Sequence, residues 1–293
     1  MSRWCLALLM MLVGSLTLPG CAGPPPASDR VRVAVSIPPL ADMARQIGGE
    51  RVAVELLVPP GTSVHTYEPT PRQVQFVATA DLLVVNGVRL EFWAPKVIAA
   101  ASNQRLRVVE TAEGLEILEQ EHEEGGNPHV WLDPVNAMHQ AERIRDALVA
   151  ADPEHRSEYE ANGARYLEAL QALDEELRAE TAAWSQRRFI GFHSAWVYFA
   201  RRYGLEQVAA IEEFPGKEPS PEHLASIVDL VRQTGVRAIF AEPQLPPRAA
   251  EAVAAEAKVE VIVLDPLGGV EGRKTYAELL RYNVAQMGKA LRK

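Results

Sequence analysis

The sequence predicts an α/β fold in which one long, rigid helix joins two Rossmann-like lobes, each with a parallel sheet. Short β-branched segments alternate with helical segments in residues 30–151 and again in residues 186–293. This alternation is typical of a parallel sheet covered by helices. Residues 152–185 interrupt it, because they carry apolar side chains at helical spacing and contain no proline apart from Pro153. Such a segment predicts a helix of roughly eight turns between the lobes.

The N-terminal lobe, residues 30–151, is predicted to contain four strands and four helices. The strand segments are rich in Val, Leu and Ile and are bounded by turn-forming residues. The helical segments show apolar residues at i, i+3 and i+4, and several begin at proline or end at glycine. We expect strands at residues 30–37, 51–58, 81–87 and 106–110, and helices at residues 38–50, 71–80, 89–102 and 135–151.

The loop before the last of these helices, "NPHVWLDP" at residues 127–134, holds a histidine between stiff neighbours. Proline fixes its own φ angle and restricts the residue before it. Pro128 and the turn that ends in Pro134 should therefore hold His129 in one place. We expect Asp133 to cap the following helix, with Pro134 as its first residue.

The linking helix and the C-terminal lobe follow the same local rules. Asp152 is a suitable N-cap and Pro153 a suitable first residue for the long helix, residues 152–185. In residues 186–293 we expect strands at residues 187–192, 207–211, 236–242 and 259–265, and helices at residues 194–204, 220–235, 246–257 and 274–293.

The N-terminus predicts export. Residues 1–20 read as a signal peptide, because an apolar run too short for a membrane span follows a positive residue. The segment before Cys21 resembles a bacterial lipobox, so we expect lipidation of Cys21 and a Pro-rich tether over residues 21–29. Pro19 departs from the usual lipobox pattern, and cleavage without a lipid is the alternative. The other cysteine of the chain, Cys5, leaves with the signal, so no thiol remains for a disulfide or a thiolate metal site.

Composition limits the class of partner. The chain has 293 residues and a formal net charge of −9, which argues against nucleic acid and suits a cation. The segment 110–126 contains seven glutamates and no Lys or Arg. Such a run is usually a solvated loop, but here it leads to His129 and could raise the local concentration of cations.

Four side chains share one position in the predicted pattern. His65, His129, His193 and Asp265 each follow a predicted strand, directly or within the next loop. Ligands of open α/β sheets bind at the carboxyl ends of strands, so these side chains should meet in the cleft between the lobes. Three imidazoles and one carboxylate suit a divalent transition metal. Taken singly, each histidine is more often a solvated or hydrogen-bonded loop residue than a ligand.

Three further residues are candidates for auxiliary roles. Glu242 ends another predicted strand and could be a fifth ligand or an acceptor for an imidazole N–H. Glu68, three residues after His65, could play the same supporting part, and His122 in the acidic segment could contact metal. Plain loop structure is the alternative for each. The remaining histidines fit surface roles on or near helices: His139, His155 and His223.

A secreted zinc hydrolase is a rival from another class. It would need an open metal position, a bound water and a general base, for which Glu68 or Glu242 could be proposed. Four protein ligands would leave no open position. The sequence contains no HExxH, GxSxG, P-loop, GxGxxG or CxxC motif. We therefore expect a binding protein rather than an enzyme.

Six motifs together resemble the metal-binding subunits of bacterial ABC importers for zinc and manganese. These are "VHTYEPTP", "NPHVWLDP", "GFHSAWVYFARRYGL", "FPGKEPSP", "FAEPQ" and "VIVLDPLG", which occur in this order over nearly the whole chain after the signal peptide. The resemblance implies two α/β lobes bridged by a rigid helix. It also implies His65, His129, His193 and Asp265 as metal ligands, each within its own matching motif.

The resemblance implies a function of capture and delivery. We expect a monomeric lipoprotein, facing the periplasm or the cell exterior, that binds Zn²⁺ and releases it to the membrane subunit of an ABC permease. His193 occupies a position where manganese-type relatives usually have glutamate, and three nitrogen ligands favour zinc. Manganese uptake is the alternative, because the loop before "NPH" is shorter than in many zinc-type relatives, and a surface adhesin is another. Since ligating imidazoles must be neutral, zinc affinity should fall below about pH 6.5.

Overall fold

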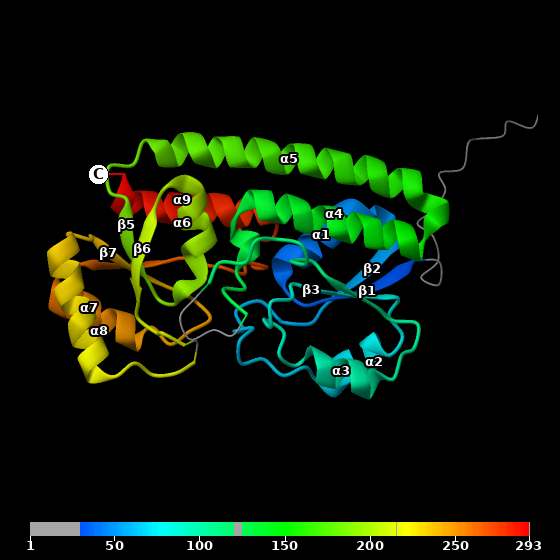
Figure 1. Cartoon of the computed structure of the whole chain (residues 1–293), viewed down its shortest axis with the longest axis horizontal. Coiled ribbons are helices and arrows are strands. Elements are labelled where there is room, and N and C mark those ends of the chain that lie inside the picture. Colours follow the sequence, from blue (N-terminus) through cyan, green and yellow to red (C-terminus); the bar gives the residue numbers. More distant parts are fainter. Residues whose placement is uncertain (1–29, 120–124, 215, 293) are drawn as a thin grey trace, which may run out of the picture.

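The computed structural model describes residues 30–119, 125–214 and 216–292. The predicted signal peptide, Cys21, the tether and His122 lie outside these residues. Figure 1 shows two α/β lobes side by side, with one long helix running along both. This architecture confirms the predicted fold class.

The N-terminal lobe is built on a parallel four-stranded sheet in the order β2-β1-β3-β4. Strand β1 pairs with β2 on one side and with β3 on the other, so the sheet grows outward from its first strand. Its strands are β1 Val31–Val35, β2 Val52–Leu56, β3 Leu82–Val85 and β4 Arg107–Glu110. All of β3 is buried, as expected for a central parallel strand.

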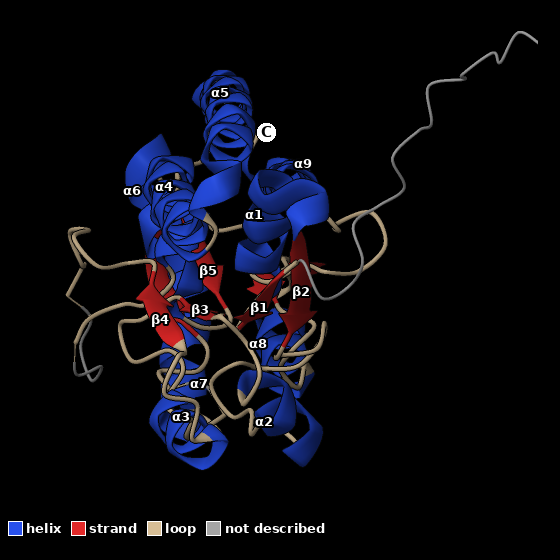
Figure 2. Ribbon diagram, turned by 90° about the vertical axis from the view of Figure 1, so that its right-hand side faces the viewer, coloured by secondary structure: helices blue, strands red, loops and turns tan. Residues whose placement is uncertain are grey.

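Helices cover both faces of this sheet. Figure 2 shows α1 and α4 on the face toward the long helix, and α2 and α3 on the opposite face. The bounds are α1 Pro38–Gly48, α2 Pro71–Val77, α3 Ala94–Ala101 and α4 Pro134–Ala151. Each of the four has proline at its first or second position, where the missing N–H is tolerated.

The C-terminal lobe repeats this topology with the order β6-β5-β7-β8. Its strands are again parallel. The bounds are β5 Arg188–Gly191, β6 Glu206–Ala210, β7 Ala238–Ala241 and β8 Glu260–Val263 for the strands, and α6 Val197–Tyr203, α7 Pro221–Thr234, α8 Arg248–Ala257 and α9 Tyr276–Leu291 for the helices. Helices α6 and α9 lie on the side of the long helix, and α7 and α8 on the other (Figure 1).

The long helix α5 spans Arg156–Ala182 and packs on α1 and α4 of one lobe and on α6 and α9 of the other. Its start differs from the prediction, since a 3-10 turn, Pro153–His155, precedes the α-helix. The Asp152 carboxylate makes no capping hydrogen bond. It instead accepts a hydrogen bond from the Tyr159 hydroxyl at 2.8 Å and lies 2.8 Å from His155 Nδ1. The predicted limits of the lobes, residues 151 and 186, stay a prediction.

The main hydrophobic core is shared by the lobes. It runs from the N-terminal sheet through Trp131 to Trp196 and Tyr276 without a break. Buried polar bonds also cross the boundary: the Asp42 carboxylate of α1 accepts the backbone N–H of Tyr276, the first residue of α9, at 2.9 Å. Among the described residues, no helix is long and apolar enough to cross a bilayer.

Candidate metal centre

Three histidines from both lobes converge between the sheets. His65 lies in the loop after β2, His129 in the loop before α4, and His193 two residues after β5. Each can direct a ring nitrogen so that all three atoms lie within 4.8 Å of one another. No other His, Cys, Asp or Glu group of comparable closeness occurs among the described residues. The structure therefore brings together the three imidazoles predicted from the sequence.

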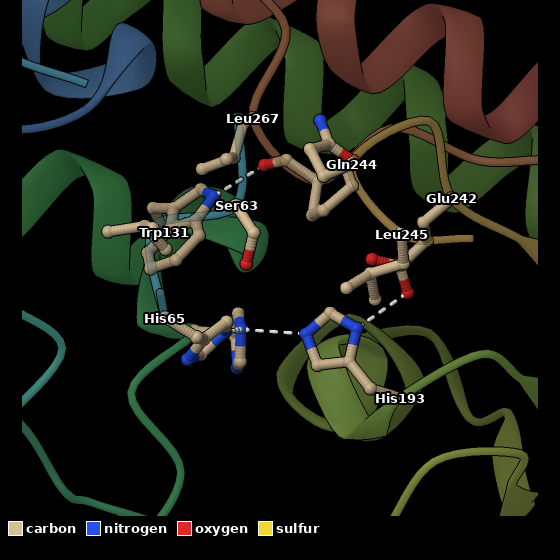
Figure 3. Close-up of a pocket in the computed structure, with 11 residues that line it drawn as sticks. Ser63, His65, Trp131, His193, Glu242, Gln244, Leu245 and Leu267 are labelled. Carbon is tan, nitrogen blue, oxygen red and sulfur yellow. Dashed lines mark hydrogen bonds and ion pairs between the residues drawn. The ribbon is translucent and has the colours of Figure 1, made fainter. Parts of the chain in front are cut away.

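The Nε2 atoms face one another. His129 Nε2 is 3.0 Å from His193 Nε2 and 3.2 Å from His65 Nε2. Figure 3 shows His65 and His193 pointing into one cavity beside Trp131. Contacts this short between ring nitrogens require either a shared proton or a cation between lone pairs, so the position of each proton decides the chemistry.

Asn127 determines the tautomer of His129. Its Oδ1 accepts the backbone N–H of His129 at 2.9 Å, and its Nδ2 donates to the Ser194 carbonyl at 2.6 Å, so the orientation of the amide is fixed. His129 Nδ1 lies 3.1 Å from the same Oδ1, which can only accept. The proton of His129 therefore resides on Nδ1, and Nε2 presents a lone pair to the cavity.

Glu242 does the same for His193. The carboxylate Oε1 lies 2.8 Å from His193 Nδ1 (Figure 3), and both side chains are buried. A carboxylate accepts, so His193 Nδ1 carries a proton and Nε2 faces the cavity. His193 Nε2 then lies 3.0 Å from the lone pair of His129 Nε2, a gap that is bridged either by a second proton on His193 or by a cation. A cation at this point would replace that proton and bind both nitrogens.

Burial keeps the imidazoles of His65 and His129 neutral. It lowers the pKa of His65 to about 3, with the charge of His193 as a second cause. Burial also holds the pKa of His129 well below 6.5, and the charges of His193 and His65 add to the effect. Neutral imidazole is the form that binds a metal. At neutral pH the site needs to release no proton from these two rings before it accepts an ion.

The cavity between the histidines is small. Its volume is about 10 Å³, and Ser63, Leu245 and Leu267 line it together with the three histidines, Trp131 and Glu242. Such a volume holds about one water-sized sphere. The site thus has room for a single ion and lacks room for an organic substrate.

The chain matches a known protein family over most of its length. The family described as "Zinc-uptake complex component A periplasmic" (ZnuA) matches residues 33–290. The chain belongs to this family. Its members are solute-binding uptake components, which confirms the prediction of a binding protein rather than an enzyme.

Individual relatives carry different metals in their names. The zinc-binding lipoprotein AdcA of Streptococcus pneumoniae is 30% identical over 285 residues, 93% of this chain and 57% of AdcA. The chain therefore spans a little over half of that relative's length. The manganese-binding lipoprotein MntA of Halalkalibacterium halodurans is 31% identical over 97% of both chains. Among solved structures, a ZnuA crystal structure is 36% identical, with a TM-score of 0.83 over 89% of this chain and 99% of that one.

The loop "NPHVWLDP" is held in place, as its sequence predicts, by contacts from both lobes. The Asn86 side chain donates to the Pro128 carbonyl at 2.9 Å. The Trp131 indole donates to the Pro266 carbonyl of the other lobe at 2.7 Å. The Asp133 carboxylate accepts the N–H of Val135 at 2.8 Å and caps α4, with proline at the first position of the helix. His129 is thus fixed by its neighbours before any ion is bound.

Asp265 is not within the histidine group. It is buried at the end of β8, and its carboxylate is already engaged. Oδ1 accepts hydrogen bonds from Gln244 Nε2 at 2.7 Å and from the N–H groups of Leu267 and Gly268 at 3.1 and 2.9 Å. Oδ2 pairs with Arg273 Nε at 3.0 Å. The role of Asp265 as fourth ligand stays a prediction, and it would require exchange of the guanidinium for an ion.

The candidates for auxiliary roles lie in different places: Glu242 contacts the histidine group and Glu68 does not. Glu242 accepts from an imidazole, which is one of its two predicted roles. Glu68 is exposed and lines a separate hollow with Trp93 and Lys96, away from the three histidines. Within the acidic segment, Glu113 pairs with Arg143 and Glu116 with Arg201, so part of its charge is neutralised.

Two buried polar residues of the site escaped sequence reasoning. Asn127 stands two residues before His129, a spacing that lets its side chain reach the backbone N–H of that residue. Glu212 follows β6 as His193 follows β5, so the same strand-end rule could have found it. Burial raises the pKa of Glu212, while the nearby charge of His193 lowers it.

Proposed function

We propose that this chain is an exported carrier that captures Zn²⁺ in the cleft between its lobes and delivers it to an ABC-type permease. One observation carries the proposal: the Nε2 atoms of His129 and His193 face each other at 3.0 Å, because an acceptor on the far side of each ring holds a proton on Nδ1. Membership of the zinc-uptake family supports the same function.

The ligand chemistry favours zinc over manganese. Three imidazole nitrogens suit zinc, whereas manganese prefers carboxylate, carbonyl and water oxygen. The nearest candidate carboxylates are engaged elsewhere: Asp265 with Arg273 and Glu242 with His193. The name of AdcA supports zinc and that of MntA supports manganese, so manganese is the second candidate for the same site.

The hydrolase alternative gains no support from the geometry. Glu242 is occupied by His193 Nδ1, and Glu68 faces a different hollow, so neither proposed base is aimed at the cavity. A cavity of about 10 Å³ admits no ester or peptide. An adhesin function would concern the outer surface rather than this site, and it stays a prediction.

Membrane anchoring belongs to the same proposal. The relatives AdcA and MntA are named lipoproteins, which supports a lipid on Cys21, an extracytoplasmic location and a permease as the partner. Radiolabelled palmitate should be incorporated into the full-length chain expressed in bacteria and lost in Cys21→Ala. Equal labelling of the two chains would refute the anchor without touching the metal site.

Two histidine variants test the proposal. His129→Ala should weaken zinc binding by at least about a hundredfold, because it removes a ligand that touches both other imidazoles. His155→Ala is the matched control, since His155 lies beside Asp152 at the start of the long helix. Competition against a fluorescent zinc chelator measures both affinities. Equal affinities in the two variants would show that the histidine group is not the zinc site.

A further inference from the structure

The side chain of Asn127 joins the metal loops of the two lobes. It is fully buried. Its Oδ1 accepts from the backbone N–H and from Nδ1 of His129, at 2.9 and 3.1 Å. Its Nδ2 donates to the carbonyl of Ser194 at 2.6 Å, and Ser194 directly follows His193 in the chain. A single amide group therefore contacts a ligand of one lobe and the backbone beside a ligand of the other.

The main chain of Asn127 is fixed as well. Its N–H donates to the Leu118 carbonyl at 2.8 Å. Its carbonyl accepts the hydroxyl of Tyr198, a residue of α6, at 2.8 Å. That hydroxyl in turn accepts the N–H of Leu118 at 2.9 Å. With its backbone held in this way, the amide cannot follow a displacement of one lobe without breaking a bond to the other.

Asparagine suits this position because the task needs one acceptor and one donor on one short planar group. Aspartate offers no donor to the Ser194 carbonyl, and alanine offers neither group. Loss of the acceptor would leave the buried N–H of His129 without its side-chain partner and would release the tautomer of its ring.

We propose that Asn127 is a positioning residue that fixes His129 in its Nδ1–H form and sets the spacing between His129 and His193. Ion binding is then coupled to contact between the lobes: the Asn127–Ser194 bond must break before the two imidazoles separate. This inference rests on the proposed metal site, although its first readout is taken without metal.

Nitrogen-15 NMR of labelled imidazoles in the metal-free protein reads the tautomer directly. In the parent chain, His129 should show the Nδ1–H form, and in Asn127→Ala it should show a mixture of tautomers. Outer-shell partners of metal-binding histidines contribute about ten- to a hundredfold to affinity, and we expect Asn127→Ala to lose zinc affinity in that range.

Asn127→Asp separates the effect of Asn127 on the tautomer of His129 from its bond to the Ser194 carbonyl. It keeps an acceptor for His129, so the Nδ1–H tautomer should persist. It removes the donor to Ser194, so zinc should dissociate about tenfold faster into excess chelator, as followed by stopped-flow fluorescence. An unchanged tautomer in Asn127→Ala or a parental dissociation rate in Asn127→Asp would overturn the proposal.

Tyr198→Phe is the matched control. It removes the bonds of the Tyr198 hydroxyl to Asn127 and Leu118 but leaves the amide in place. In Tyr198→Phe, the tautomer of His129 should be that of the parent, and the zinc affinity should lie within about threefold of the parental value. If Tyr198→Phe instead lost as much affinity as Asn127→Ala, Asn127 would act only by stabilising the loop. Should Asn127→Ala fail to fold, the dissociation rates of Asn127→Asp and Tyr198→Phe decide. If the parent binds no zinc, the proposed function fails, and the tautomer comparison still decides the role of Asn127.

Discussion

At the scale of single residues, the direction of two protons defines the site. The Nδ1–H groups of His129 and His193 point away from the cavity, toward Asn127 and Glu242. Each acceptor therefore controls its histidine through Nδ1, the ring nitrogen that faces away from the cavity. Neither Asn127 nor Glu242 has to touch the ion to control how many lone pairs the ion meets.

Asp265 provides a test at this scale. If the pair with Arg273 persists when zinc is bound, Asp265→Asn should change zinc affinity by less than about threefold, whereas removal of a fourth ligand should cost at least about a hundredfold. His193→Ala, measured by the same competition titration, should lose at least about a hundredfold. Circular dichroism checks that Asp265→Asn is folded despite the unpaired guanidinium. A loss as large as that of His193→Ala would establish Asp265 as the fourth ligand.

The pKa shifts of the histidines determine a second test. Burial lowers the pKa of His65 to about 3, whereas in the unfolded chain this imidazole gains its proton near pH 6.5. Between these values the unfolded chain binds more protons than the folded one. The free energy of unfolding of the metal-free protein should therefore fall as the pH drops below about 6.5, with the stabilisation fully present above it.

Zinc affinity should respond differently from stability. Because His65 and His129 remain neutral in the folded protein, these two rings should take up no proton in competition with zinc from about pH 7.5 to about pH 5.5, so affinity should fall less steeply than three ordinary imidazoles would require. Urea unfolding of the metal-free protein, measured across this pH range, tests the predicted stability. Zinc competition titrations over the same range test the predicted affinity. An affinity loss steeper than tenfold per pH unit below about 6.5, which requires more than one protonating ring, would contradict the shifts.

The sequence identifies the three imidazoles because a local rule places each of them after a parallel strand. It does not show whether Asp265 faces the ion, because that depends on Arg273, which lies eight residues later and could equally have faced solvent. The tautomer of His129 depends on the Asn127–Ser194 contact between lobes, which leaves no signal in composition or spacing.

At the scale of elements, the Asp133 cap connects the metal loop to α4. Asp133→Ala removes the acceptor for the N–H of Val135 and should lower the free energy of unfolding by about 1 kcal/mol. Asp133→Asn retains a side-chain oxygen and should recover most of this loss. Urea denaturation of the metal-free variants measures both. If both variants lost the same free energy of unfolding, the loss would come from the ion pair of Asp133 with Arg202, 3.7 Å away, and not from the helix cap.

Element boundaries departed from prediction where backbone conformation overrode side-chain spacing. The helix expected at residues 89–102 begins only at Ala94. Val88 and Arg89 adopt positive φ angles of 53° and 58°, which an α-helix excludes, and Pro95 then occupies the first turn. The interior of the long helix agrees with its apolar periodicity, but the start predicted from Asp152 and Pro153 is wrong, because these residues lead into a 3-10 turn.

At the scale of the whole molecule, the main core spans both lobes, while a second cluster lies under α7 and α8 of the C-terminal lobe. Asp42 of α1 accepts the N–H of Tyr276 at 2.9 Å and lies 3.3 Å from the hydroxyl of Tyr166 on the long helix. Three elements from both lobes thus meet at one buried carboxylate. Such contacts should keep movements between the lobes small.

Asp42→Ala tests the contribution of this contact. It leaves a buried N–H of α9 without its partner and should lower the free energy of unfolding by about 1–3 kcal/mol, while Asp42→Asn keeps an acceptor and should lose less. Because the main core spans both lobes, unfolding should remain one cooperative transition in urea, by both fluorescence and circular dichroism. Separate transitions for the two lobes would contradict a shared core.

The central claim, a zinc site built from three imidazoles, is tested most directly by calorimetric titration of residues 30–293 with zinc and with manganese. The account predicts one tight zinc ion per chain and much weaker manganese. Comparable or tighter manganese binding would keep the site and change the cargo to manganese. The absence of any tight metal would contradict the account.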